Sequence, residues 1–216
     1  MDSRAATFAA IQAGETGKLR ALLAQDASLA SATNDQGVSA VMIALYYRQA
    51  DSLKVLTAAK PELDLFEATS TGNTARVAQL LDSDPALISS YSVDGFTALH
   101  FASFFAEEAA ATLLLKRGAD VTAVAKNATK VMPLHSAATG RNVAIVRALL
   151  EHGAPPNARQ QHGWTPLHAA AQNGDRLLVE VLLQHGADRA LANDDGVTAV
   201  ELAKKSKNPS LAELLA

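Results

Sequence analysis

The sequence predicts an all-α repeat solenoid, a row of stacked helix–turn–helix units joined by short β-hairpin fingers. Three observations lead to this fold class. Residues 162–188 read as two short helices, each with one apolar stripe. The same pattern returns along the chain at a nearly constant period, as in repeat proteins. Apolar residues make up 49% of the 216 residues and aromatic residues only 5%, which suits short helices packed through Ala and Leu. Helices this short cannot bury their stripes alone, so the units are expected to stack.

The stretch 162–188 indicates where the helices of one unit begin and end. Thr165 is an N-cap residue, and Pro166 occupies the first helical position, where a backbone N–H is not needed. The second helix carries Leu and Val at i, i+3 and i+4 spacing. It ends at His185-Gly186, because glycine accepts the left-handed conformation at a helix C-terminus.

Counting from the position of Thr165 gives about seven units, including two caps, in one domain that spans 1–216. The units are expected to start near residues 5, 39, 63, 97, 132, 165 and 198, at separations of 34, 24, 34, 35, 33 and 33 residues. The short separation lacks the residues of one finger, so we expect the finger to be missing near 60–65. Pro61 blocks a continuous helix there, and the chain must turn almost directly from one helix into the next.

Three units share a motif at both ends. Their first helices begin with TALH (97–100), MPLH (132–135) and TPLH (165–168), and their second helices end in LLKRGAD, LLEHGA and LLQHGAD. This pattern resembles the ankyrin repeat, and the plain layout with DPAL-type turns resembles bacterial ankyrin repeat proteins. The resemblance implies a non-enzymatic module that binds a protein partner on its concave side. In that family the concave side is formed by the finger tips and by two variable positions near the end of each first helix.

Other parts of the chain depart from the regular pattern. The first three units carry only the weaker half of the motif, such as Leu-Leu followed by a turn with Asp-Ala or Asp-Pro. Residues 66–95 repeat the pattern of residues 8–37, either through duplication or because both stretches follow the same packing rules. The linker 121–131 is longer than its neighbours and has Lys130 where they have Gly, so we expect an altered finger turn. The lysine-rich last unit suits a C-terminal cap.

Composition excludes several function classes. The net charge of −3 is spread along the chain, which argues against nucleic-acid binding. The chain contains no cysteine, so it has neither a disulfide framework nor a thiolate metal site. No signal peptide or membrane-length apolar segment is visible, so we expect a cytoplasmic protein without membrane contact. No catalytic constellation, cofactor motif or metal site is recognised, and we expect a monomer, with a homodimer as the alternative.

The histidines have structural explanations. His100, His135 and His168 recur at the same position of three successive units. Equivalent atoms in stacked helices lie roughly 10 Å apart, which is too far for shared metal coordination at about 2 Å. We expect these rings to be buried and to bond to the Thr at the helix start or to finger backbone. His152 and His185 are expected at helix ends, where the helix dipole favours a positive charge.

The placement of the ten aromatic residues is the most informative functional feature. Phe8, Phe66 and Phe101 fall on core-facing positions. The others are expected on the partner-binding surface, with four polar residues as a rim: Tyr46, Tyr47, Tyr91, Phe96, Phe104, Phe105 and Trp164, and then Gln161, His162, Gln172 and Asn173. Large rings provide contact area at little entropic cost.

Two explanations of these rings remain open at this point. The rings either anchor a protein partner or pack on each other in the hollow left by the missing finger. A rival function is a small-ligand or catalytic pocket at the irregular 60–66 junction. Another is self-association through the exposed rings.

Overall fold

The computed structural model describes residues 2–60, 62–206, 208 and 210–216. Pro61, where we expect the chain to turn, lies outside these residues, as do Lys207 and Pro209 of the last unit. Within these described residues the helices form seven consecutive pairs: α1 (Ser3–Ala13) with α2 (Thr16–Gln25), α3 (Ala40–Tyr46) with α4 (Ala50–Ala59), α5 (Leu65–Ser70) with α6 (Thr74–Ser83), α7 (Ala98–Phe104) with α8 (Glu108–Lys116), α9 (Pro133–Gly140) with α10 (Val143–Glu151), α11 (Pro166–Gln172) with α12 (Arg176–Gln184), and α13 (Ala199–Lys205) with α14 (Leu211–Leu215).

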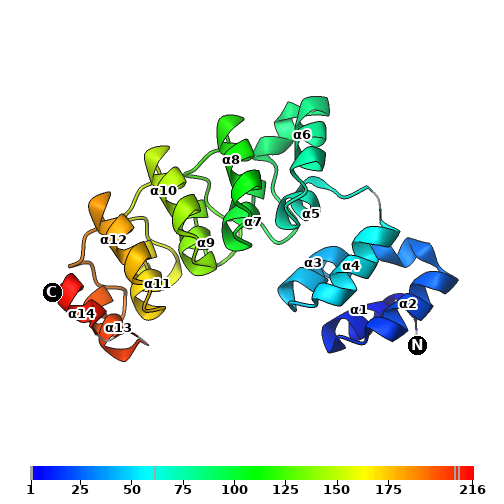
Figure 1. Ribbon diagram of the computed structural model, residues 1–216, viewed down its shortest axis with the longest axis horizontal. Helices are drawn as coiled ribbons and strands as arrows, with labels where there is room; N and C mark the ends of the chain where they lie inside the picture. Colours follow the sequence, from blue (N-terminus) through cyan, green and yellow to red (C-terminus); the bar gives the residue numbers. More distant parts are fainter. Residues whose placement is uncertain (1, 61, 207, 209) are drawn as a thin grey trace.

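The pairs stack in a row, so the predicted all-helical repeat solenoid is confirmed (Figure 1). From α5 to α13 the first helices lie along the inner side of the row and the second helices along the outer side. The core between them consists of small and branched apolar residues, such as Ala102, Leu114 and Leu149, which are fully buried. Each short helix therefore buries its stripe against its own partner and against the neighbouring pairs.

The N-caps explain where the first helices begin. Ser39, Thr97, Met132, Thr165 and Thr198 cap their helices at the expected positions. The other two first helices start elsewhere, for a local reason in each case. The side chain of residue 2, Asp2, accepts a hydrogen bond from the Arg4 N–H, so α1 starts before residue 5. Asp64 and Glu67 form a capping box, so α5 starts after residue 64.

The fingers are hairpin-like turns with little strand pairing, which corrects the expectation of β-hairpins. Isolated antiparallel bridges join Thr33 to Ser39 and Ala192 to Thr198. In the fourth unit two backbone bonds close the turn, from the N–H of Ser92 to the carbonyl of Phe96 (2.9 Å) and from the N–H of Gly95 to the carbonyl of Ser92 (3.0 Å). Such short turns offer too few paired residues to form a ladder.

Finger tips in the C-terminal half are tied to one another by backbone hydrogen bonds. These bonds run from Lys126 N to Gly95 O (2.8 Å), from Gln161 N to Thr129 O (2.9 Å) and from Asp194 N to His162 O (3.0 Å). In the fifth finger Lys130 adopts the left-handed conformation (φ 52°) that glycine adopts in neighbouring fingers. The turn itself is altered, because its closing bond runs from Ala125 N to Val131 O (2.8 Å) and spans more residues than the bond from Ser92 N to Phe96 O in the fourth finger.

The junction after the second unit is built differently. α4 ends at Ala59 and α5 begins at Leu65, and the two outer helices α4 and α6 do not pack side by side as α6 and α8 do (Figure 1). The finger of the second unit approaches that of the fourth: a Cβ built on Gly37 would lie 3.4 Å from Cγ1 of Val93. In the described part of the chain, no helix is long and apolar enough to cross a bilayer.

Candidate protein-binding surface

Aromatic side chains of the second, third and fourth units pack into one group, which we call the aromatic cluster. Its members are Tyr46, Phe66, Phe96, Phe101, Phe104 and Phe105. Ring centroids are 6.1 Å apart for Tyr46–Phe105, 5.8 Å for Phe66–Phe101, 5.7 Å for Phe96–Phe101, 6.4 Å for Phe101–Phe105 and 5.1 Å for Phe104–Phe105. Offset and edge-on contacts at these distances are favourable for aromatic pairs. Packing of the rings on each other is thus part of their role.

The cluster is nevertheless open to solvent on one side. Tyr46 is 38% exposed and Phe104 is 43% exposed, and the neighbouring Tyr47 is 50% exposed. Phe105 is half-buried, because consecutive helical residues point about 100° apart and only one of the two can face outward. Phe101 lies in the core, as expected, but Phe66 is only partly buried.

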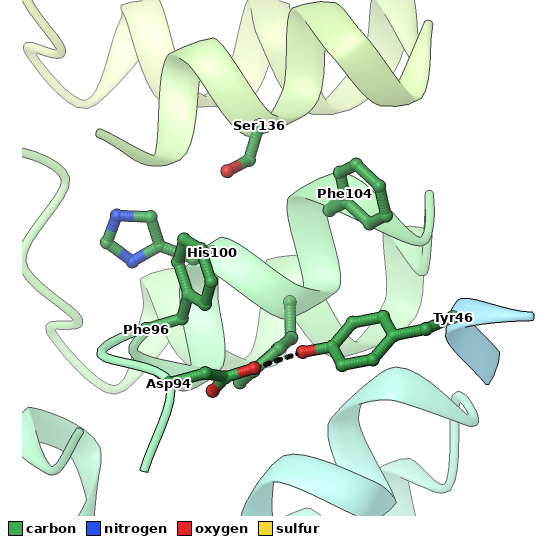
Figure 2. Close-up of a pocket in the computed structure, with 7 residues that line it drawn as sticks. Tyr46, Asp94, Phe96, His100, Phe104 and Ser136 are labelled. Atoms are coloured by element: carbon green, nitrogen blue, oxygen red, sulfur yellow. Dashed lines mark hydrogen bonds between the residues drawn. The ribbon is translucent and has the colours of Figure 1, made fainter. Parts of the chain in front are cut away.

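A pocket of about 220 Å³ opens in the exposed side of the cluster (Figure 2). Its lining comes from the second, fourth and fifth units and consists of Tyr46, Asp94, Phe96, His100, Phe101, Phe104 and Ser136. The Tyr46 hydroxyl donates a hydrogen bond to the carboxylate of Asp94, linking α3 to the finger before α7. Burial, and then the Asp94 carboxylate, raise the pKa of Tyr46 far above its ordinary value, so this hydroxyl stays protonated.

A second, more open hollow of about 480 Å³ adjoins the first. It is lined by Phe96, Phe104, Thr129, Val131, His135, Ser136, Thr139, Gln160, Gln161, His162, Trp164 and Gln172. Phe96, Phe104 and Ser136 belong to both linings, so the two hollows form one continuous surface along the fingers and first helices. The ring of Trp164 lies against that of His168, with centroids 5.7 Å apart.

The structure brings together most of the residues singled out in the sequence, but not all of them. Tyr46, Phe96, Phe104, Gln161, His162, Trp164 and Gln172 line the two hollows. Tyr91 lies under the ammonium of Lys126, 3.9 Å from the ring centroid. Tyr47 and Asn173 line neither hollow, and Phe105 lies within the cluster.

Sequence reasoning missed two polar residues of the first pocket. Asp94 looks like an ordinary turn residue, since Asp-Gly is a common hairpin dipeptide. Ser136 follows MPLH on α9 and has no distinguishing pattern. Their role in the lining depends on how units that are distant in sequence meet, and no local signal identifies it.

The three recurring histidines have the structural role expected of them. Nδ1 of His135 accepts from the Met132 N–H (3.1 Å), and its Nε2–H donates to the Ala158 carbonyl (3.0 Å). His100 and His168 make the same two kinds of bond, to their own N-caps and to later carbonyls. Burial lowers the pKa of all three rings, that of His135 to about 4, so they are neutral. Among the described residues, no three His, Asp or Glu side chains converge as metal ligands would.

The irregular junction also contains a hollow, of about 240 Å³, and each charged residue of its lining, Lys60, Asp64 and Asp94, already has a partner within the chain. Nζ of Lys60 lies 2.8 Å from Oε1 of Glu67, whose side chain is fully buried. The Asp64 carboxylate accepts from the Glu67 N–H (2.8 Å) and caps α5. Burial, and then the Glu67 carboxylate, raise the pKa of Asp64. These groups hold the helix start in place.

Comparison with known proteins identifies the family. A model described as "Ankyrin repeat" matches residues 94–126, and one described as "Ankyrin repeats (3 copies)" matches residues 134–216. The chain is 38% identical over 94 residues to a "Probable E3 ubiquitin-protein ligase XBOS31" of Oryza sativa subsp. japonica. That alignment covers 43% of this chain and 21% of the relative, so the chain matches about a fifth of the relative's length. With family models matched over more than half of its length, the chain belongs to the ankyrin repeat family.

Proposed function

We propose that this chain is a non-enzymatic module that binds a protein partner through the two adjoining hollows. Ankyrin repeats are typically protein–protein interaction modules. The observation that carries the proposal here is that two exposed rings, Tyr46 and Phe104, line the same pocket. A soluble protein does not ordinarily leave such a contiguous aromatic patch in water unless another molecule covers it.

The binding surface proposed has aromatic anchors and a polar rim. Phe104 and Trp164 are the principal anchors, because each lines a hollow and neither is fully buried. Gln161, His162 and Gln172 are exposed around Trp164 and supply hydrogen-bonding groups. Binding energy at interfaces concentrates on a few such rings, surrounded by polar contacts that exclude water.

The stacked helices suit this role because they fix the surface before a partner arrives. Tyr46 is held by its hydrogen bond to Asp94 and its stacking on Phe105. Phe104 is held against Phe105, and Trp164 lies against His168. Side chains that are already ordered lose less entropy on association, so more of the contact energy is retained as affinity.

The test is to remove the two principal anchors together. A Phe104→Ala/Trp164→Ala variant and the wild type are used to capture partners from a lysate of the native host, with quantitative mass spectrometry as the readout. We expect the specific partner to be lost at least tenfold, since aromatic hot spots typically contribute 2 kcal/mol or more. Phe96 is left intact, because it is half-buried against Phe101 and its removal would also weaken the fold.

The matched control is Leu177→Ala on the outer helix α12, where the side chain is 63% exposed. This variant loses an exposed apolar group away from the hollows and should retain the partner. Circular dichroism should show the same helix content for all proteins. Retention of the partner by the double variant at unchanged strength would show that the surface is wrongly placed.

The same measurements separate the remaining alternatives. Self-association through the rings predicts a mass that rises with concentration in light scattering and falls to that of a monomer in the double variant. The name of the rice relative gives ligase activity to that protein, and for this chain we propose partner binding alone. A cytoplasmic location suits a chain without cysteine.

A further inference from the structure

We propose that the pocket in Figure 2 receives the guanidinium group of an arginine side chain presented by the partner. This inference rests on the proposed function and specifies the chemistry of the partner. The pocket encloses about 220 Å³, whereas pockets for whole small molecules generally enclose about 300–1,000 Å³. Its size therefore suits one inserted side chain.

The walls of the pocket are suited to an organic cation. Tyr46, Phe96 and Phe104 surround the opening in Figure 2, and Phe101 completes the lining. The faces of aromatic rings carry negative electrostatic potential and attract a cation within about 6 Å of the centroid. Arginine is the cation that fits best, because its planar group stacks on rings and is less strongly hydrated than an ammonium.

The pocket also contains a counter-charge. Asp94 is the only acidic residue in its lining, and no lysine or arginine lines it among the described residues. His100, the other titratable ring there besides Tyr46, is kept neutral because burial lowers its pKa. The lining therefore carries one negative charge, and one positively charged group of a partner would neutralise it.

The Asp94 carboxylate is already oriented, with room for further donors. Oδ2 accepts from the Tyr46 hydroxyl and Oδ1 from the Ser92 hydroxyl. A carboxylate has about four acceptor positions, so a guanidinium can still bind it. Ser136 directs its hydroxyl toward the pocket from α9 (Figure 2) and offers a further acceptor. The several N–H groups of a guanidinium can reach both sides, which a single ammonium cannot do as well.

A neighbouring finger contains a cation–π pair in which both the ring and the cation belong to this chain. Nζ of Lys126 lies 3.9 Å from the centroid of the Tyr91 ring. No cation of the chain is provided in the same way for the pocket formed by Tyr46, Phe96 and Phe104 among the described residues. The comparison indicates that the cation of the pocket comes from outside.

The test uses small probes and does not require the natural partner. Nα-acetyl-arginine N-methylamide, its lysine counterpart and its citrulline counterpart are titrated at millimolar concentration into protein with ¹³C-labelled aromatic rings. Citrulline has nearly the shape of arginine without the charge. We expect arginine to shift the Tyr46, Phe96 and Phe104 ring signals, with citrulline at least tenfold weaker and lysine several-fold weaker.

Two variants and a matched control link the binding to this pocket. Asp94→Asn keeps an acceptor for Tyr46 but removes the charge, and should weaken arginine binding about tenfold. Phe104→Leu keeps an apolar side chain but removes the ring face, and should weaken it several-fold. Asp195→Asn changes the equivalent aspartate before Gly196 in the seventh unit, far along the row, and should have no effect.

The outcomes distinguish this inference from the proposed function. Equal binding of the arginine and citrulline probes, lysine binding as strong as arginine, or an unaffected Asp94→Asn variant would each overturn the arginine assignment. The protein-binding surface would still stand if the Phe104→Ala/Trp164→Ala variant lost its partner. If the arginine probe binds but that variant keeps its partner at full strength, the pocket is a cation site and the interface lies elsewhere.

Discussion

Units four to six and the junction between units two and four place chemically different side chains at the same helical position. The third residue after the N-cap is His100, His135 or His168 in α7, α9 and α11, and each imidazole donates to a later carbonyl of the chain. In α5 this position is Glu67, whose carboxylate accepts from the Lys60 ammonium.

The difference follows from what each group can donate. A neutral imidazole accepts at one nitrogen and donates at the other, so it can join its own helix start to the next finger. A carboxylate only accepts, so Glu67 cannot bond to a carbonyl. The Glu67 carboxylate accepts a hydrogen bond from the Asp64 N–H (3.0 Å). Its buried negative charge also needs a cation, which is the ammonium of Lys60 at the end of α4. At the short connection between α4 and α5, a buried ion pair and the aromatic cluster join the units.

The strongest test of this comparison is to remove the positive charge of Lys60. Lys60→Met keeps most of the apolar stem but leaves the buried Glu67 carboxylate unpaired. Removing one partner of a buried ion pair costs about 3–5 kcal/mol, and we expect a loss of that size in the free energy of unfolding in urea. The Lys54→Met control changes a lysine whose side chain is 79% exposed, and should cost well under 1 kcal/mol.

A double variant tests the cause of this loss. Adding Glu67→Gln to Lys60→Met removes the unpaired charge and should restore part of the stability, because an amide is cheaper to bury than a carboxylate. If the double variant is no more stable than Lys60→Met alone, the ion pair is not what holds the junction.

The histidine side of the comparison predicts a dependence on pH. The pKa of His135 is lowered to about 4 in the folded chain, whereas an unfolded histidine titrates near 6.5. Between these values the unfolded chain binds a proton that the folded chain does not, so stability is complete above about pH 6.5 and falls as the pH decreases toward 4.

His135→Gln isolates this contribution, since groups common to both proteins cancel in the difference. On going from pH 7.5 to 4.5, wild type should lose roughly 2 kcal/mol more than the variant, measured as the free energy of unfolding in urea. Equal losses in the two proteins would mean that the ring is not held neutral.

The regular features of the fold could be predicted from the sequence, because they are local. The N-cap, the proline after it and the glycine at the end of the second helix lie within one unit, and the recurring histidine bonds to the helix start three residues away. The altered fifth finger could also be anticipated, since the linker 121–131 is longer than its neighbours.

The site could be predicted only in part, because its geometry depends on contacts between units. The positions of Phe96, Phe104 and Trp164 on one surface follow from the repeat register. The pairing of Tyr46 with Asp94 does not, since the two residues belong to the second and fourth units and meet across the third. Tyr91 lies under Lys126 because of how two fingers approach, which the sequence pattern does not specify. The partner-binding role of these residues stays a prediction.

Finger spacing in the regular row can be tested with two glycines that share one conformation. Gly95 and Gly186 both have φ of +87°. A Cβ on Gly95 would lie 2.8 Å from the backbone carbonyl carbon of Lys126, whereas a Cβ on Gly186 would meet nothing within 4 Å. Both substitutions to alanine carry the cost of a left-handed conformation, on the order of 1 kcal/mol.

The difference between the two variants measures the close approach alone. We expect Gly95→Ala to be less stable than Gly186→Ala by about 1–2 kcal/mol, the range typical of overpacking. Thermal or urea unfolding followed by circular dichroism gives both values. Equal stability would show that the fourth and fifth fingers can separate at little cost.

The smallest expected effect concerns the hydrogen bond that spans the third unit. Tyr46→Phe removes the hydroxyl that donates to Asp94 and leaves the ring stacked on Phe105. Because Tyr46 is 38% exposed, water can replace part of the lost bond, and the cost should be about 0.5–1 kcal/mol. Tyr47→Phe removes a hydroxyl from the adjacent, more exposed ring and should cost less. A loss as large as that of Lys60→Met would mean that this single bond contributes as much to the junction as the buried ion pair does.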